Sequence, residues 1–371
     1  MNTAQNPTLE TSRKLLYVGS NSDLFRKDIS KNLEFVYTVR LFADTSGLER
    51  AVKGEPPAAL ILDDMIPPKG GINVISHYRS IRRYKSLPIV FAIDQNDRET
   101  IANAKTYNGV ECLIKPYSVN DLQVAISRAA SAGVEAEWKT IEPVQRQALT
   151  QTLHSFNAIA DMINDEQPVV YEDVRESCGP LVNAVSDGNY KDMLRGVQDH
   201  DNYSFVHSLR VATFLSLFGH AIGIRGEDLM TLSTGGLLHD VGKMFIPHEV
   251  LNKAGKLSDD EFTVMKSHVT HTNGYLGQTD LPRGVIVIAG QHHEKLDGTG
   301  YPDGLKGTEI NQLARMAAIV DVFGALTDKR VYKEAMEPEK ALGMMSEWKT
   351  HLDQELLGKF REMLLDAATI D

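Results

Sequence analysis

The sequence contains very little cysteine, two residues among 371. Cys112 and Cys178 lie far apart and form neither a redox nor a metal-binding spacing, so no disulfide framework is predicted. An excess of positive charge is also lacking, because 39 Lys and Arg residues face 50 Asp and Glu residues. The net charge of −11 argues against a protein that holds nucleic-acid duplexes through counterion release. A small anionic ligand stays compatible, since it needs only a local cationic pocket or a metal.

Long apolar runs are absent as well. The most apolar stretches begin at Val211 and Gly284, and both are too short or too interrupted to span a bilayer. The first fourteen residues are polar and lack the apolar core of a signal peptide. We therefore expect a cytoplasmic protein without a membrane segment, and the scarcity of cysteine agrees with a reducing compartment.

The composition is that of a globular protein, with 42% apolar and 24% charged residues. At about 150 residues per domain, a chain of 371 residues predicts two or three units. The residue pattern divides the chain into an α/β domain over 13–130, a helical connector over 131–198 and an all-α domain over 199–371.

Short β-type runs alternate with amphipathic helical stretches in the first of these regions. The runs are Lys14–Val18, Val36–Phe42, Ala58–Asp64, Leu87–Ile93 and Val110–Lys115. This alternation predicts a doubly wound, five-stranded parallel sheet. Ligand sites in such sheets lie at the carboxyl ends of the strands, which gathers Asp63, Asp64 and Lys115 around one crevice.

The spacing around this crevice resembles the receiver domain of response regulators. Asp63 is followed by Pro67 and Gly71, and the fifth run ends in Lys-Pro-Tyr at 115–117. In that family, the aspartate that ends the third strand accepts a phosphoryl group on Mg²⁺, and an acidic pair after the first strand holds this ion. The resemblance makes Asp63 the position of the phosphoacceptor.

Two departures from the receiver pattern concern this chemistry. The acidic pair is replaced by Gly19-Ser20, and Ile93 stands where a Ser or Thr is expected. Without the acidic pair the divalent cation loses most of its ligands. We interpret Asp63 as a vestigial phosphoacceptor in a domain kept for dimerisation or docking; a phosphorylation switch is the alternative.

The helical connector contains one apolar stripe, formed by Leu149, Leu153, Phe156, Ala160 and Ile163. Their steps of three and four residues place them on one helix face. The stripe is shorter than a coiled coil requires, so it predicts packed core rather than a dimer seam.

Histidines gather in the third region. Nine of the twelve lie between 200 and 293: His200, His207, His220, His239, His248, His268, His271, His292 and His293. Neutral imidazole is the commonest metal ligand in proteins, and a local excess beside acidic residues is typical of a transition-metal site.

Several local patterns shape this site. His239 and Asp240 are adjacent on a helix, and Lys243 shares a face with His239. His292-His293 runs into a glycine-rich loop at 295–307, and Asp321 interrupts an apolar run, where an unpaired carboxylate would be costly. His268 stands alone on a further helical stretch.

Taken together, these motifs are similar to the HD-GYP family of cyclic di-GMP phosphodiesterases. The matching segments are His-Ser at 207–208, HDxGK at 239–243, HHExxDGxGYP at 292–302 and DVFGALTDKRVY at 321–332. They occur in the family's order, and the resemblance runs from about Asp201 to Lys333. It implies an all-α, HD-type helical domain.

The resemblance also implies a ligand set. One metal would be held by His207, His239, Asp240 and Asp321, and a second by His268, His292 and His293, with Asp240 bridging. Members with three metals have a glutamate four residues before the first histidine; Tyr203 stands there, which favours two metals. After His268 the segment departs from the family pattern, so the local helix geometry stays open, and His271 is an alternative ligand.

Ligands of this kind suit iron or manganese, and zinc also fits the ligand types. The family's chemistry implies a bridging hydroxide that attacks a phosphodiester in line. By the same resemblance, Lys243 meets a phosphate oxygen or, with Asp201, protonates the leaving alkoxide. Arg330 and Lys333 would contact the second phosphate, and Tyr301 would contact the substrate from the glycine-rich loop.

The function implied is hydrolysis of cyclic di-GMP to pGpG, with further hydrolysis to GMP left open, regulated through the receiver-like domain. The expected partners are the cyclic dinucleotide, a diguanylate cyclase bound through the GYP loop, and a second copy of the chain in a homodimer. Two alternatives stand beside it: a catalytically weak dinucleotide sensor or docking protein, and a phosphodiesterase for a hybrid cyclic GMP-AMP dinucleotide, since the residues do not reveal base selection.

Overall fold

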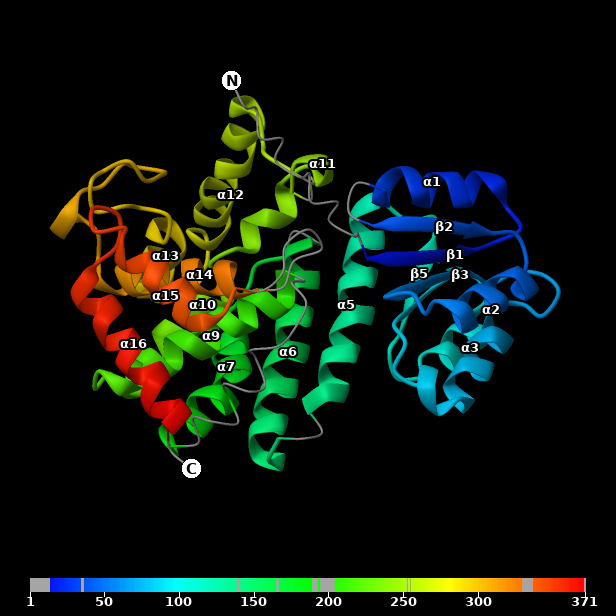
Figure 1. Cartoon of the computed structure of the whole chain (residues 1–371), viewed down its shortest axis with the longest axis horizontal. Coiled ribbons are helices and arrows are strands. Elements are labelled where there is room, and N and C mark those ends of the chain that lie inside the picture. Colours follow the sequence, from blue (N-terminus) through cyan, green and yellow to red (C-terminus); the bar gives the residue numbers. More distant parts are fainter. Residues whose placement is uncertain are drawn as a thin grey trace, which may run out of the picture.

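The computed structural model describes residues 14–34, 37–138, 141–164, 167–188, 193, 204–251, 253, 255–328 and 336–369. Asp201, Arg330 and Lys333, which the sequence places among the functional residues, lie outside this described part, as does Tyr203. Figure 1 shows an α/β unit on one side of the molecule and a helical unit on the other, with the long helix α5 between them.

The α/β unit contains the predicted five-stranded parallel sheet. Its strands are β1 (Leu15–Gly19), β2 (Thr38–Phe42), β3 (Ala59–Asp63), β4 (Ile89–Asp94) and β5 (Val110–Lys115). They pair in the order β2-β1-β3-β4-β5, and every pairing is parallel. This is the flavodoxin-like strand order, so the predicted doubly wound sheet is confirmed.

Helices cover both faces of this sheet. They are α1 (Asp23–Leu33), α2 (Thr45–Gly54), α3 (Gly71–Ser80), α4 (Arg98–Ala104) and α5 (Val119–Glu137). Side chains of α2, α3 and α4 pack with one face, and those of α1 and α5 pack with the other. Successive strand residues serve opposite faces: Tyr17 joins the first cluster, whereas Leu16 and Val18 join the second. Because all five strands are parallel, the carboxyl ends of β1, β3 and β5 lie at the same edge of the sheet.

The remaining described residues form a helical unit without strands. Its α-helices are α6 (Pro143–Asn164), α7 (Tyr171–Ser186), α9 (Ser204–Ala221), α10 (Gly226–Leu238), α11 (His248–Leu251), α12 (Asp259–Leu276), α13 (Arg283–Gln291), α14 (Gln312–Thr327), α15 (Pro338–Ser346) and α16 (Gln354–Thr369). A 3₁₀ helix, η3 (Val241–Phe245), follows α10. The predicted all-α architecture is confirmed.

One continuous hydrophobic core runs through this unit, from Trp138 to Met363. The helices α6 and α7 belong to the same core as α9 and α10, although their residues form the predicted connector. Of the apolar stripe on α6, Leu149 and Phe156 illustrate the result, since both are buried. The prediction of packed core is confirmed. None of the described helices has the length and apolar character that crossing a bilayer requires.

The two units are joined by contacts between α5 and α6. The Arg128 guanidinium on α5 donates a hydrogen bond of 3.0 Å to the carbonyl of Asn157 and forms an ion pair with Asp161, both on α6. Figure 1 shows these two helices lying next to one another. The α/β unit is thus attached to the first helix of the helical core.

Candidate metal centre

Five helical segments bring the predicted ligands to one place. His207 lies in the first turn of α9, and Asp321 lies in the middle of α14. His239 and Asp240 link α10 to η3, His268 projects from α12, and His292 and His293 directly follow α13. Close packing makes this convergence geometrically feasible: a Cβ added at Gly242 would lie 2.0 Å from the carbonyl oxygen of His268. Only glycine lets η3 approach α12 this closely.

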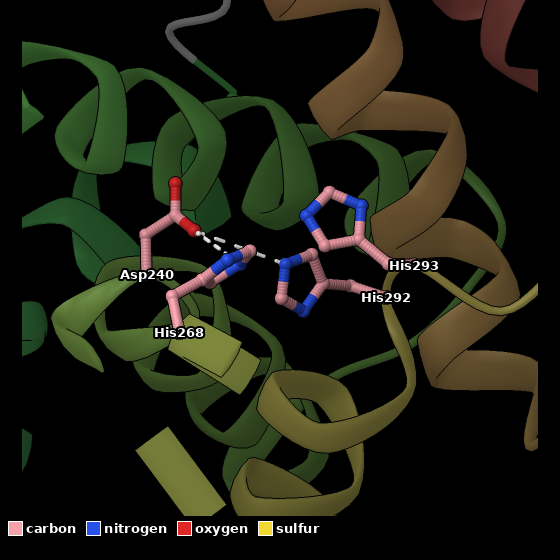
Figure 2. A group of neighbouring side chains, drawn as sticks. All are labelled: Asp240, His268, His292 and His293. Carbon is pink, nitrogen blue, oxygen red and sulfur yellow. Dashed lines mark ion pairs between the residues drawn. The ribbon is translucent and has the colours of Figure 1, made fainter. Parts of the chain in front are cut away.

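The seven side chains form two groups that share one carboxylate. Asp240, His268, His292 and His293 make the first group, and His207, His239, Asp240 and Asp321 make the second. Within each group, one ligand atom of every residue lies within 4.8 Å of the others. Figure 2 shows the first group, with Asp240 and the three imidazoles turned toward one another. These are the two sets that the sequence predicts; their binding of metal stays a prediction.

Three of the histidines are oriented in the same way. The Nδ1 atoms of His239, His268 and His292 lie 2.7, 2.7 and 2.8 Å from backbone carbonyl oxygens three residues earlier, those of Gly236, Met265 and Ala289. A carbonyl oxygen only accepts, so Nδ1 carries a proton in each ring. In the neutral ring, Nε2 is then the atom with a free lone pair, and the helix backbone aims it into the centre.

Four buried atoms at this centre have no hydrogen-bond partner: Nε2 of His239, His268 and His292, and Oδ1 of Asp240. His268 Nε2 lies 3.3 Å and His292 Nε2 3.9 Å from Asp240 Oδ1, but neither contact is a hydrogen bond. Each unsatisfied buried polar atom costs about 1–3 kcal/mol. A divalent cation would satisfy these four atoms at once, and mixed nitrogen and oxygen donors are those that transition metals take. The residues fit a metal.

The second group is arranged around two carboxylates. His207 Nε2 lies 3.0 Å from Asp321 Oδ1, and His239 Nε2 lies 3.1 Å from Asp240 Oδ2 and 3.7 Å from Asp321 Oδ1. The Lys243 ammonium forms a close ion pair with Asp240 Oδ2 at the edge of the site. One carboxylate therefore faces imidazoles of both groups and a lysine.

Protein groups alone keep the two carboxylates ionised. Burial raises the pKa of Asp240, but His239 and Lys243 hold it well below its ordinary value. Burial raises the pKa of Asp321 as well, but the hydrogen bond with His207 and the nearby His239 imidazole hold it well below its ordinary value. These carboxylates can therefore act as anionic ligands at any pH near neutrality.

Histidines of the two groups differ in protonation. Burial lowers the pKa of His239, but Asp240 and Asp321 more than offset it and raise the pKa to about 10. Burial lowers the pKa of His293 to about 3 and takes that of His292 well below its ordinary value. His292 and His293 are thus neutral and ready to ligate, whereas a bound cation would displace the proton from His239.

The glycine-rich loop is tied to the site by one buried carboxylate. Glu294 accepts hydrogen bonds from the backbone N–H groups of Asp303, Gly304 and Leu305 at 2.7, 3.0 and 3.0 Å. The loop passes so close that a Cβ at Gly300 would lie 2.4 Å from the backbone nitrogen of Lys295. This anchoring presents Tyr301, whose ring stacks on His293 with centroids 4.7 Å apart.

Two points that the sequence left open concern the helix that contains His268. His271 is exposed, belongs to neither group and packs its ring against Phe245, with centroids 5.5 Å apart. The helix α12 continues to Leu276, so the departure from the family pattern after His268 does not break it.

Sequence reasoning missed the partners of His207. Asp328 Oδ2 lies 2.9 Å from His207 Nδ1, and the Arg210 guanidinium forms an ion pair with Asp328 Oδ1. Asp328 stands seven residues after Asp321, two helical turns along the same face. That spacing was the signal that could have identified it.

At the edge of the sheet, the predicted meeting of Asp63, Asp64 and Lys115 is confirmed, and one ammonium group faces two carboxylates. Lys115 Nζ lies 2.7 Å from Oδ1 of Asp63 and 2.7 Å from Oδ1 of Asp64, and the Ser20 hydroxyl donates to Asp63. Burial raises the pKa of Asp63, but its hydrogen bonds with Asp64, Lys115 and Ser20 bring it down to about 2. Burial and the neighbouring Asp63 raise the pKa of Asp64. Ile93 is buried in β4.

Known proteins resemble this chain over most of its length. A sequence model of the HD domain matches residues 157–356, which is more than half of the chain. The chain also aligns with the cyclic di-GMP phosphodiesterase response regulator RpfG of Xanthomonas campestris, at 30% identity over 77% of this chain and 70% of the relative. An alignment of that length cannot fit into the helical unit alone. The chain therefore belongs to the HD domain family, as its histidine and aspartate motifs predict.

Other relatives match a smaller share. The 3'3'-cGAMP-specific phosphodiesterase 3 of Vibrio cholerae is 37% identical over 44% of this chain and 35% of its own length. A cyclic di-GMP phosphodiesterase of Pseudomonas aeruginosa is 35% identical over 43% and 39%, so the chain spans little more than a third of both relatives. Among solved structures, an HDGYP protein from Bdellovibrio bacteriovorus superposes with a TM-score of 0.50, at 19% identity over 66% of this chain and 81% of that one. This last likeness shows the fold.

Proposed function

We propose that this protein is a metal-dependent phosphodiesterase that hydrolyses cyclic di-GMP to pGpG. One observation carries the proposal: four buried ligand atoms without hydrogen-bond partners converge beside two ionised carboxylates. Relatives named as cyclic dinucleotide phosphodiesterases support the substrate class.

The two groups would hold two divalent ions, with Asp240 as the shared ligand. Imidazole and carboxylate donors without thiolate favour iron or manganese. Bound ions of this kind supply Lewis acidity to a phosphate and lower the pKa of water. The protein's own part is to hold seven ligands on five rigid helical segments, so that little reorganisation is needed when the substrate arrives.

Groups around the rim would bind the substrate. The Lys243 side chain is 26% exposed, so its ammonium can contact a phosphate oxygen while it stays paired with Asp240. With Asp201, it would deliver a proton to the leaving alkoxide. Tyr301, supported by Glu294 through the loop, would contact the ribose or base, and Arg330 and Lys333 would bind the second phosphate.

The α/β unit would act as a docking or dimerisation module rather than a phosphorylation switch. Its crevice supports this, because Lys115 and Ser20 already satisfy Asp63. The contact between Arg128 and α6 offers a route to the helical unit. The GYP loop would serve as the surface for a diguanylate cyclase.

The deciding experiment incubates anaerobically purified full-length protein, loaded with iron or manganese, with cyclic di-GMP and separates the products by chromatography. Asp240→Asn is the control, because it weakens the shared ligand without changing side-chain size. We expect the wild type to form pGpG and the Asp240→Asn variant to form none. No product from a wild type with both metals bound would reject the proposed activity.

A second candidate is a phosphodiesterase for a hybrid cyclic GMP-AMP dinucleotide. The 37% identity to a 3'3'-cGAMP-specific relative favours it. A competition assay with both dinucleotides decides between the two substrates through the ratio of their kcat/KM values. A dinucleotide sensor would instead bind the ligand without turnover, and titration calorimetry on the same preparation would reveal that outcome.

A further inference from the structure

We propose that Asp328 and Arg210 are positioning residues that set the tautomer and direction of His207, and that they control one metal position while leaving the other unaffected. This inference rests on the proposed function, because it takes the His207 group to be a metal site. Asp328 and Arg210 themselves neither ligate the metal nor touch the substrate.

The histidines of the centre are oriented in two different ways. His239, His268 and His292 each face a carbonyl oxygen three residues earlier in the chain. Such a partner belongs to the local helix geometry, so no side chain controls it. His207 instead has a carboxylate partner from another helix, Asp328 at the end of α14, 121 residues away in the chain. Its orientation therefore depends on side-chain chemistry.

Asp328 uses its two oxygens for two different tasks. Oδ2 faces His207 Nδ1 at 2.9 Å, whereas Oδ1 is paired with the Arg210 guanidinium. Arg210 Nη2 donates a further hydrogen bond of 2.7 Å to Thr327 Oγ1, and the guanidinium lies 5.5 Å from the ring centroid of Phe214. Arg210 and Asp328 are both 2% exposed. The carboxylate is thus held from one side and directs His207 from the other.

Burying such an ion pair is weak evidence for a stabilising role, because desolvation offsets most of the attraction between the charges. A positioning role accounts for it better. Carboxylate partners of ligating histidines fix the ring orientation and raise ligand basicity, and their loss typically costs about 10- to 100-fold in metal affinity. The ligand that Asp328 contacts is His207, a member of the second group.

Replacement of Asp328 by Asn creates a conflict with no good solution. The amide has a single oxygen, yet both Arg210 and the Nδ1–H of His207 need an acceptor. If the oxygen turns to Arg210, the amide N–H₂ group faces Nδ1, the proton moves to Nε2, and that atom no longer ligates. If the oxygen turns to His207, the amide N–H₂ group faces a buried cation. Either outcome weakens the His207 position.

The test measures metal binding rather than turnover. Wild type, Asp328→Asn and a matched control, Asp353→Asn, are titrated with Mn²⁺ as full-length proteins by equilibrium dialysis, and the dinuclear state is followed by electron paramagnetic resonance. Asp353 forms an analogous pair at 2.7 Å with Arg315, which lies on α14 like Asp321, but neither partner belongs to the two ligand groups. We expect two sites in wild type and control.

In Asp328→Asn we expect one site unchanged and the other weakened about 10- to 100-fold, with the coupled spectrum replaced by that of a single ion. Two unchanged sites in Asp328→Asn overturn the inference, and so does equal weakening of both. Should this variant fail to fold, Thr327→Val decides the matter: it removes one acceptor of Arg210, and we expect selective weakening of the same site. Unchanged affinities in Thr327→Val would then overturn the inference. A wild type that binds no Mn²⁺ would reject the proposed function instead.

Discussion

Each of the two units of this protein brings two carboxylates close together, but the groups that face these carboxylates differ. At the edge of the sheet, Lys115 lies 2.7 Å from both Asp63 and Asp64, so the protein supplies its own cation. In the helical unit, Lys243 reaches only one oxygen of Asp240, and the other oxygen has no hydrogen-bond partner. In the first cluster the protein's own lysine contacts both carboxylates, whereas the second contains a buried carboxylate oxygen that could still ligate a cation.

This difference separates a cluster whose carboxylates share an internal cation from one whose buried ligand atoms lack hydrogen-bond partners. Acidic residues by themselves indicate little, since both crevices contain two. The decisive feature is whether buried ligand atoms converge without hydrogen-bond partners, as the Nε2 atoms of His239, His268 and His292 do. A chain that kept such a cluster without a use for it would bear several kcal/mol of unsatisfied burial, at about 1–3 kcal/mol for each atom.

The comparison is tested most severely by making the same substitution in both crevices. Asp240→Asn is expected to reduce cyclic di-GMP hydrolysis by at least about 1,000-fold, because it weakens a ligand shared by both groups. Asp63→Asn is expected to leave hydrolysis within about twofold of wild type. Initial rates of product formation at matched metal content measure both effects. A large loss in Asp63→Asn would mean that the sheet crevice still controls the enzyme.

Removal of the metal should lower the thermal stability of the helical unit. A metal present at 100 times its Kd stabilises the native state by about 2.7 kcal/mol, which corresponds to a fall in Tm of about 5–10 °C on removal. Both tryptophans, Trp138 and Trp348, belong to the helical core, so their fluorescence reports on the unit that holds the centre. Thermal scans before and after chelation measure the shift. The same melting temperature from tryptophan fluorescence before and after chelation would contradict a metal within this core.

Removal of the internal cation should destabilise the sheet unit. Lys115→Met leaves two neighbouring carboxylates without their cation, which we expect to lower the free energy of unfolding by about 1–3 kcal/mol at pH 7. Lys69→Met, which breaks an exposed pair with Glu49, is the matched control and should change it by at most about 0.5 kcal/mol. Urea unfolding measures both differences.

The pH dependence of the same variant gives the sign of the effect. The pKa of Asp63 falls from 3.8 to about 2 on folding, so the unfolded state binds the proton first and this part of the stability is lost as pH falls from about 4 to about 2. In Lys115→Met the two carboxylates repel and their pKa values rise, so acidification below neutrality should stabilise the variant relative to pH 7. An unchanged pH profile would contradict the role assigned to Lys115.

The smallest expected effect concerns the loop beside the metal centre. Glu294→Gln leaves one of the three loop N–H groups facing an amide donor, which should loosen Tyr301 and raise KM about fivefold with metal content unchanged. Glu309→Gln is the control. Glu309 is an exposed residue of the same loop region, and its carboxylate accepts a hydrogen bond from the backbone N–H group of Lys306. Steady-state kinetics and metal analysis measure both quantities. Loss of metal from Glu294→Gln would assign this residue to the centre itself.

Much of the fold could be predicted from the sequence because the two units have different periodicities. The five predicted strands overlap β1 to β5, with ends that differ by at most two residues, since short apolar runs separated by amphipathic segments admit few other arrangements. Helical periodicity likewise predicted the second unit. The common core of α6, α7, α9 and α10 was not predictable, because packing between helices depends on which faces meet.

The candidate ligands were predictable for a related reason. Histidines and aspartates at fixed spacings are chemically conspicuous, so His239-Asp240 and His292-His293 stand out in the sequence alone. Asp328 did not stand out, because a lone aspartate near a helix end has many ordinary roles. Its spacing of seven residues from Asp321 was the one signal in the sequence, and the structure adds that it lies 2.9 Å from His207 Nδ1.

The sequence by itself determined the class of each unit and the chemistry available to it, since periodicity and side-chain type are properties of the chain. Tertiary structure alone decided which charges are satisfied. It brought Lys115 to Asp63 and Asp64 across 52 and 51 residues, and it left four buried atoms of the candidate metal centre without hydrogen-bond partners. The physical reason is that desolvation and hydrogen bonding act over a few ångströms, and only folding brings residues distant in the chain within that range.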